Sequence, residues 1–250
     1  MPRSINRILP AILLLVALSG CERRQSEPSI AATQPAGGQT RAGTGIIEGT
    51  VTLAGRPPVM QAIVNQPCHA GVKPIMDESV VVDASGHLDN VVVYLEEAPP
   101  APPTARLSPT VMDQIDCRFA PHVIAARTGQ TVHFLTRDPT LHNVHGLCTI
   151  NPAFNFALVA PGQSRDLAFT NSETFPVRCD VHPWMKAYVC VFAHPYFAVT
   201  NAAGHFAIKN VPAGTFTLVA WQEKYGTSRS PVRVDDTKVT AKDFVFQSGL

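Results

Sequence analysis

Cys179-Asp-Val-His-Pro-Trp-Met185 places a thiol, an imidazole and a thioether within one short run of chain. A single tight loop would turn all three side chains toward one ion. Thiolate and thioether ligands beside imidazole favour copper, and two histidines, one cysteine and a weak axial methionine form the ligand set of blue-copper electron-transfer sites. The run therefore predicts three copper ligands, Cys179, His182 and Met185, and requires a second histidine from elsewhere.

The segment Leu141-His-Asn-Val-His-Gly146 offers that second histidine. Side chains alternate between the two faces of a strand, so His142 and His145 are expected on opposite sides, and only one of them can easily join the ligand loop. We favour His142 as the ligand. Five other histidines are expected to be strand or turn residues with no metal role: His122, His133, His145, His194 and His205.

The residues around the ligand run predict a rigid loop. Cys179 is expected to end a strand over residues 175–179, and residues 188–192 form an apolar strand that anchors the far side. Pro183 restricts the backbone of His182 and biases it away from helical geometry. Ligands held on strands and a proline-stiffened loop suit one-electron transfer, because such a site changes little between its two oxidation states.

This part of the chain resembles the cupredoxins of the amicyanin type. Residues 136–145 and 179–186 follow the amicyanin pattern, including its short ligand loop, and the likeness extends over about residues 118–192. The resemblance implies one type 1 copper ion with four ligands: His142, Cys179, His182 and Met185. It also implies that electrons pass through the His182 edge, where Pro183 and Trp184 would contact a docked redox partner.

Asp180 departs from the cupredoxin pattern. Cupredoxins often have Ser or Thr after the ligand cysteine, and its hydroxyl bonds the Asn beside the first ligand histidine. A carboxylate at position 180 is still able to bond Asn143, so both residues are expected in the outer shell of the site. The added negative charge near copper is expected to lower the reduction potential.

The segments on both sides predict an all-β protein. Short β-type runs alternate with Gly, Pro, Asn and Asp, as in sandwiches and barrels. Residues 45–58 and 199–221 resemble a carboxypeptidase regulatory-like (transthyretin-like) β-sandwich. We therefore expect a cupredoxin Greek-key sandwich at 110–192, inserted into a smaller transthyretin-like sandwich built from 46–109 and 193–250. Two sequential domains, the second following the first, are the simpler alternative.

The N-terminus predicts export. Two arginines and an apolar stretch at residues 8–18 form a secretory signal over residues 1–20. Leu18-Ser-Gly-Cys21 resembles a bacterial lipobox, which implies acylation of Cys21; an ordinary signal peptide with a stray cysteine is the alternative. Residues 21–45 have almost no large apolar groups and read as a flexible tether. The expected location is the bacterial cell envelope, lipid-anchored and facing the periplasm.

Four cysteines then remain for an oxidising compartment, and four cysteines allow three pairings. We favour Cys148–Cys190, because both residues lie just beyond the proposed ligands on strands near the site. Cys68–Cys117 then follows. The alternative is that these residues are free thiols or extra metal ligands.

The sequence favours an electron carrier over an enzyme. It contains no Ser-His-Asp order, phosphate-binding glycine loop or paired-carboxylate signature, and the four-ligand set leaves no open metal position. Expected partners are transient redox proteins, such as a c-type cytochrome or a dehydrogenase. A likeness to cupredoxins of the methylamine-utilisation type does not establish the partner. The 20 basic and 19 acidic residues give no support to nucleic-acid binding.

Two rival functions stay open at this point. One is a copper storage or delivery lipoprotein that uses the same sulfur ligands. The other is a non-redox binding module in which the sandwich recognises a partner and the metal is structural.

Overall fold

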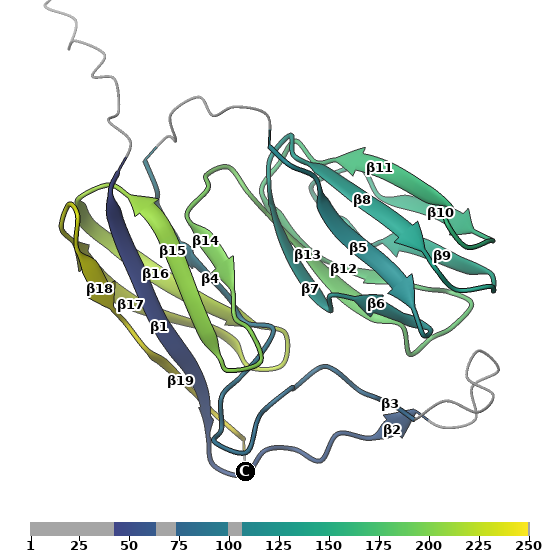
Figure 1. Cartoon of the computed structure of the whole chain (residues 1–250), viewed down its shortest axis with the longest axis horizontal. Coiled ribbons are helices and arrows are strands. Elements are labelled where there is room, and N and C mark those ends of the chain that lie inside the picture. Colours follow the sequence, from purple (N-terminus) through teal and green to yellow (C-terminus); the bar gives the residue numbers. More distant parts are fainter. Residues whose placement is uncertain (1–42, 64–73, 100–106, 250) are drawn as a thin grey trace, which may run out of the picture. The chain divides into compact units, whose positions relative to one another are not determined.

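The computed structural model describes residues 43–63, 74–99 and 107–249. These ranges contain nineteen β-strands and no helix, which confirms the all-β class predicted from the sequence (Figure 1). In the same ranges, no helix has the length and hydropathy that a membrane span needs. The predicted signal peptide, most of the tether, Cys21 and Cys68 lie outside the described residues.

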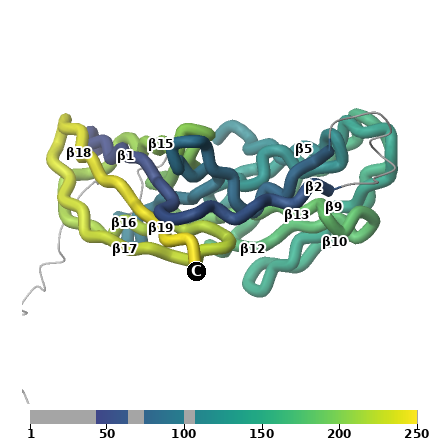
Figure 2. The backbone as a smooth tube through the Cα atoms, turned by 90° about the horizontal axis from the view of Figure 1, so that it is seen from below, coloured from purple at the N-terminus to yellow at the C-terminus, as the bar shows by residue number. Residues whose placement is uncertain are grey.

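Strands from before and after the central segment share one sandwich, called here the flanking sandwich. Its first sheet has the order β15-β1-β18, with β19 also pairing β1, and its second has the order β14-β4-β16-β17. The strands are β1 (Gly45–Ala54), β4 (Val92–Leu95), β14 (Phe197–Val199), β15 (His205–Val211), β16 (Gly214–Gln222), β17 (Gly226–Val234), β18 (Val239–Ala241) and β19 (Phe244–Gln247). Figure 2 shows β1 beside β18 and β19, its two parallel partners.

Alternation along β1 explains the core of the flanking sandwich. Ile47, Val51 and Leu53 are buried while the residues between them are partly exposed, as a half-buried strand requires. They pack with Phe206 of β15 and Leu218 of β16, so the apolar faces of both sheets meet in one cluster.

The central sandwich is formed by residues 110–192. One sheet has the order β10-β9-β12-β13-β7, and the other has the order β11-β8-β5-β6. The strands are β5 (Thr110–Ile115), β6 (Arg118–Ala120), β7 (Val123–Arg127), β8 (Thr131–Thr136), β9 (His142–Gly146), β10 (Phe154–Leu158), β11 (Ser164–Ala168), β12 (Glu173–Arg178) and β13 (Lys186–Phe192). Met112 and Phe134 from one sheet pack with Val144 and Val189 from the other.

A short two-stranded pair, β2 (Ala62–Ile63) and β3 (Ile75–Met76), lies between β1 and β4 in the chain. Ile75 is buried, and it belongs to the apolar cluster of the central sandwich rather than to that of β1. The pair therefore brings residues 61–63 and 75–79 against the segment that carries the predicted ligands.

Candidate metal centre

The ligand run forms the loop of a tight hairpin. β12 and β13 pair antiparallel up to Arg178 and Lys186, so the run begins directly where β12 ends. The N–H of Cys179 donates to the carbonyl of Met185 at 3.2 Å, and the N–H of Met185 donates to the carbonyl of His182 at 2.9 Å. These bonds close the loop on itself and fix its backbone.

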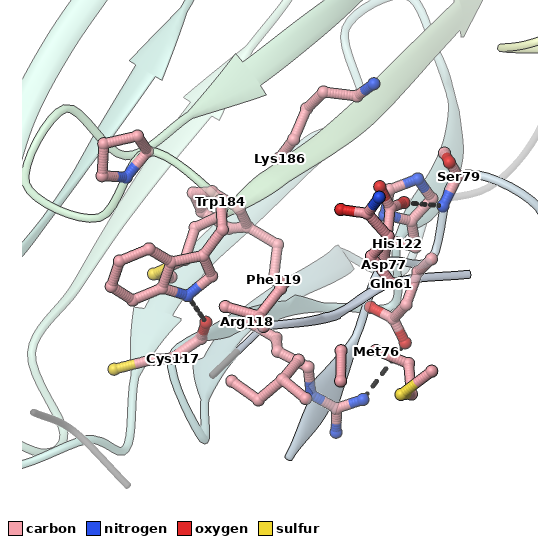
Figure 3. A pocket seen from close by; sticks show the side chains of 16 residues that line it. Gln61, Met76, Asp77, Ser79, Cys117, Arg118, Phe119, His122, Trp184 and Lys186 are labelled. Atoms are coloured by element: carbon pink, nitrogen blue, oxygen red, sulfur yellow. Dashed lines mark hydrogen bonds and ion pairs between the residues drawn. The ribbon is translucent and has the colours of Figure 1, made fainter. Parts of the chain in front are cut away.

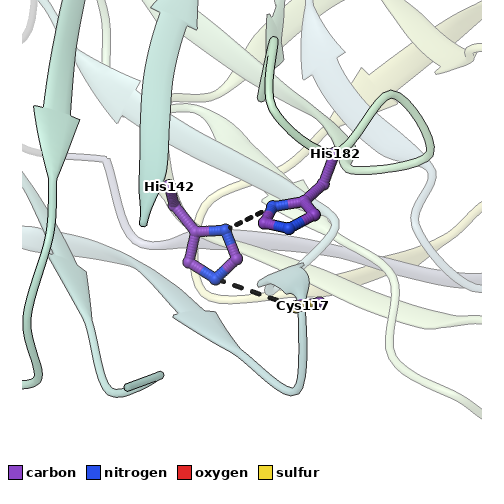
Figure 4. Close-up of side chains that lie close together, drawn as sticks. All are labelled: Cys117, His142 and His182. Carbon is purple, nitrogen blue, oxygen red and sulfur yellow. Dashed lines mark hydrogen bonds between the residues drawn. The ribbon is translucent and has the colours of Figure 1, made fainter. Parts of the chain in front are cut away.

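The predicted ligands converge. His142 begins β9 and is fully buried, and β9 pairs with β12 beside the loop. Its Nδ1 lies 2.9 Å from Nδ1 of His182, and Sγ of Cys179 lies 3.9 Å and 3.7 Å from these two nitrogens. Figure 4 shows the two imidazoles turned toward each other. Three donor atoms thus face one common point, inside a site where Cys179 is 2 % and His182 is 7 % exposed.

Met185 is also buried and belongs to the same apolar cluster as Cys179. Main-chain hydrogen bonds join it to Cys179 and His182, so the same loop carries a thioether, a thiol and an imidazole. A thiolate, two imidazoles and a thioether are the donor set that suits copper, so the residues fit the ion predicted from the sequence. A bond between Met185 and a metal stays a prediction.

Asp138 fixes the orientation of the His142 ring. Its Oδ2 accepts a hydrogen bond from Nε2 of His142 at 2.9 Å, which leaves Nδ1 as the free metal-binding nitrogen. The carboxylate also accepts the N–H groups of Asp116 and Cys117, each at 2.8 Å. Burial favours a higher pKa for Asp138, but the hydrogen bonds from His142 and these amides outweigh it and hold the pKa below its usual value.

Hydrogen bonding also sets the charges of the ligands. Burial favours a lower pKa for His142, yet its hydrogen bonds to Asp138 and Cys179 raise that pKa to about 9. Burial favours a higher pKa for the Cys179 thiol, but hydrogen bonds from His142 and nearby amides bring it below its usual value. These hydrogen bonds therefore favour the charged forms of both side chains, and the thiolate is the form that binds metals.

Asn143 ties the ligand loop to β9. Its Oδ1 accepts the N–H of Asp180 at 2.6 Å, and its Nδ2 donates to the Asp180 carboxylate at 2.8 Å. The hydrogen bond expected between these residues is thus present. Asp180 also accepts hydrogen bonds from Asn155 at 2.9 Å and His145 at 3.0 Å, and it lies on the exposed side of the loop.

The exposed edge of His182 is apolar. Pro183 is exposed, and Val181 and Leu141 are 47 % and 45 % exposed. Trp184, by contrast, is half-buried. Its ring lies 5.0 Å from the His182 ring, and its Nε1 donates a hydrogen bond to the carbonyl of Cys117 at 3.1 Å (Figure 3). The sequence singled out Pro183 and Trp184, but it gave no signal for Val181 and Leu141 beyond their positions next to ligands.

The predicted disulfide Cys148–Cys190 is wrong, because both thiols are free. Cys190 packs with Val123 and Phe192 on one face of its sheet, whereas Cys148 packs against the cluster on the other face. The two thiols therefore belong to different apolar clusters. Burial raises the pKa of Cys190 to about 12 and that of Cys148 to about 11.

Cys117 is disulfide-bonded, and its predicted partner Cys68 lies outside the described residues. A role as an extra metal ligand was only the alternative for Cys117, yet its donor atom and those of His142 and His182 lie within 4.8 Å of one another. No short-range pattern signals this contact, since it depends on how the β5–β6 turn folds.

The five histidines expected to have no metal role lie outside the one metal-ligating group found in the described ranges. His122 bonds Glu223, His133 bonds Asp166 at 2.5 Å, and His145 bonds Asp180. His194 accepts the N–H of Tyr196 at 3.2 Å, and His205 is exposed.

Comparison with known proteins adds an independent likeness. No family model matches the chain. Amicyanin from Paracoccus denitrificans is 26 % identical over 110 residues, which are 43 % of this chain and 84 % of amicyanin. This likeness supports a cupredoxin domain in the chain.

Some solved structures also match part of the chain. A reduced amicyanin variant matches 40 % of this chain and 97 % of its own, at 22 % identity and a TM-score of 0.31. A purple cupredoxin from Nitrosopumilus maritimus matches 33 % and 98 %, at 18 % identity and a TM-score of 0.29. A copper-containing nitrite reductase from Thermus scotoductus matches 38 % at 22 % identity and a TM-score of 0.32, and this chain spans 25 % of its length.

Proposed function

We propose that the chain is an electron-transfer protein that binds a single copper ion through Cys179, His142 and His182, with Met185 as a weak axial ligand. One observation carries the proposal. The sulfur and the two Nδ1 atoms lie no more than 3.9 Å apart in a buried site, and they are the donor types that select copper. Bound copper would supply the one-electron change between Cu(I) and Cu(II).

The surrounding residues keep the donors in place. Asp138 fixes the ring of His142, and Asn143 joins the strand of His142 to the loop of Cys179. The closed backbone of the hairpin loop fixes Cys179 and Met185 relative to each other. Ligands that are held by packing and hydrogen bonds need little rearrangement when the metal charge changes, and this property suits fast electron transfer.

The exposed edge of His182 is the proposed docking surface for redox partners. Leu141, Val181 and Pro183 give it apolar character, which suits brief contact with a second protein. We propose transient partners outside the cytoplasm, of the c-type cytochrome or dehydrogenase kind. Turnover at the metal is not part of the proposal, since four protein ligands leave no open position for a substrate.

We further propose that acylated Cys21 tethers the chain to the bacterial cell envelope, facing the periplasm, and that the flanking sandwich is of the transthyretin-like type. The first proposal rests on the signal-like residues 1–20 and on Cys21. Mass measurement of the exported protein tests it, because a lipid-modified Cys21 peptide is expected and an unmodified one would contradict it.

Visible absorption of the copper-loaded protein tests the proposed centre. A thiolate bound to Cu(II) gives an intense charge-transfer band, which Cys179→Ser is expected to abolish. Cys148→Ser is the matched control, because Cys148 is a free thiol outside the group of metal-ligating residues, and its loss is expected to leave the band unchanged. A folded, copper-loaded wild-type protein without the band would contradict the proposal.

A second function, storage or delivery of Cu(I), is favoured by one observation. Two of the four proposed ligands, Cys179 and Met185, are buried sulfur donors, the type that Cu(I) prefers. Fast loss of copper to a competing chelator without reversible redox cycling would favour delivery over electron transfer.

A further inference from the structure

His145 shares a face of β9 with Asn143. Residues two apart in a strand point to the same side, and Val144 between them belongs to the apolar cluster of the central sandwich. Asn143 and His145 therefore face away from that cluster. β10 pairs with β9 so that Asn155 lies directly opposite His145, and the loop that follows β12 brings Asp180 to the same side. His145 is thus in a position to act on the chain neighbours of the ligands rather than on the metal.

Four side chains on this face form one hydrogen-bond network. Nδ1 of His145 lies 3.0 Å and 3.1 Å from the two carboxylate oxygens of Asp180. Oδ2 of Asp180 also accepts hydrogen bonds from Nδ2 of Asn143 at 2.8 Å and from Nδ2 of Asn155 at 2.9 Å. Asn143 in turn donates to Oδ1 of Asn155 at 2.8 Å. A carboxylate only accepts hydrogen bonds, so His145 is the donor and carries a proton on Nδ1.

The network joins the chain neighbours of two proposed ligands. Asn143 follows His142, Asp180 follows Cys179, and the N–H of Asp180 donates to Oδ1 of Asn143 at 2.6 Å. The Asp180 side chain is 52 % exposed, so hydrogen bonds rather than packing hold its carboxylate in place. Hydrogen bonds to a charged acceptor are roughly twice as strong as those between neutral groups. The bond from His145 is the main reason why the pKa of Asp180 lies below its usual value, so the network stabilises the charged carboxylate.

We propose that His145 is a positioning residue of the copper centre, which holds the Asp180 carboxylate against Asn143 and offsets part of its negative charge. A negative charge near copper favours Cu(II) over Cu(I) and lowers the reduction potential. A donor that bonds the carboxylate weakens this effect, because the positive end of its N–H dipole faces the charge. His145 therefore keeps the potential higher than the carboxylate would otherwise set it. The proposal rests on the proposed function, because it concerns the reduction of the same copper ion by one electron from a redox partner.

Voltammetry of the copper-loaded full chain tests the proposal. His145→Ala is expected to lower the reduction potential, whereas His145→Asn is expected to keep it near the wild-type value, because the amide Nδ2 takes the place of the imidazole Nδ1. His133→Ala is the matched control and should leave the potential unchanged, since His133 is a similarly exposed histidine of the same sandwich that bonds another carboxylate, that of Asp166. An unchanged potential in His145→Ala, or an equal fall in His145→Asn, would overturn the proposal.

The same comparison in a chain without the carboxylate separates this role from a general loss of structure. In the Asp180→Ser background, His145→Ala is expected to cause no shift of the potential, since no charge is left to offset. A shift as large as that in the wild-type background would contradict the proposal.

Hydrogen exchange in the metal-free protein gives a readout that does not depend on copper. His145→Ala is expected to speed the exchange of the Asp180 amide proton by about threefold or more, because the released carboxylate no longer holds Asn143, which accepts this N–H. His133→Ala should leave the rate unchanged, and equal rates in wild type and His145→Ala would contradict the positioning role. Failure of the proposed function is distinguishable, because the Cu(II) charge-transfer band would then be absent from wild type and every variant while the exchange rates still differed.

Discussion

Asp138→Asn is the substitution that most directly perturbs the electrostatics of the centre. In the metal-free protein the pKa of His142 is raised from 6.5 to about 9, and Asp138 and Cys179 are the two partners that raise it. Asparagine keeps the size of the side chain and one acceptor oxygen for the Cys117 amide, but it removes the negative charge 2.9 Å from Nε2. Because His142 is fully buried, solvent screens little of that charge.

The expected result is a fall of the His142 pKa by about one to two pH units, which is about 1.4 to 2.7 kcal/mol between the protonation states. The raised pKa means that the protonated ring stabilises the metal-free fold fully below about pH 6.5, and that this stabilisation is lost as the pH rises through about 9. In Asp138→Asn the protonated His142 ring should therefore stabilise the metal-free fold less, and this stabilisation should be lost at a lower pH than in wild type. Copper binding must displace the proton of His142, so copper affinity rises with pH until that proton is lost. In the variant this rise should level off at a lower pH than in wild type.

An NMR titration of the imidazole signals in metal-free protein measures the effect. Asp166→Asn is the matched control, because Asp166 pairs with His133 on the exposed side of the same sandwich. The control is expected to leave the His142 titration unchanged. If Asp138→Asn also left the pKa of His142 unchanged, the assigned role of Asp138 would be refuted.

Three further predictions follow from single contacts. Asp180→Ser should raise the reduction potential of the copper-loaded protein, because it removes a negative charge near the metal. The free energy of reduction should change by less than about 1 kcal/mol, since this carboxylate is exposed and screened by solvent. Voltammetry measures the potential, and a lowered potential would contradict the argument. Glu173→Gln should lower the free energy of unfolding by about 1–3 kcal/mol, since the carboxylate accepts hydrogen bonds from Ile150 and Asn151. The wild-type carboxylate, with its pKa lowered to about 2, stabilises the fold above about pH 4.5 and loses this effect as the pH falls through 2, so urea unfolding at pH 7 and pH 2 should differ less in the variant. Gly146→Ala should lower the thermal midpoint, with a cost of about 1–3 kcal/mol, because a Cβ at this position would lie 2.2 Å from the Phe154 ring; an unchanged midpoint would show that the ring moves freely.

Local patterns in the sequence predicted much of the fold and the centre. Short β-type runs separated by Gly, Pro, Asn and Asp indicated the strands, and the all-β class is confirmed. The spacing of Cys179 and His182 placed both on one short hairpin loop. Alternation along β9 also separated His142, which is buried, from His145, which faces Asp180.

Contacts that depend on how distant segments pack were not predictable in this way. Asp138 reaches His142 from an irregular segment, so no strand or helix period signals it. The turn at Cys117 needs two residues with positive φ that are neither glycine nor asparagine, and the sequence gives no cue for this. The incorrect Cys148–Cys190 disulfide came from proximity along the chain to the ligands, although alternation along β13 already placed Cys190 on the face opposite to Val189 and Val191.

The electron spin resonance spectrum of the full chain loaded with one equivalent of Cu(II) tests the central claim most directly. A copper ion held by the Cys179 thiolate and the imidazoles of His142 and His182 is expected to show the narrow hyperfine splitting of a strongly covalent copper–sulfur bond. That splitting should widen in Cys179→Ser. A wide splitting in the wild-type protein, identical to that of Cys179→Ser, would contradict a copper–thiolate centre at this site.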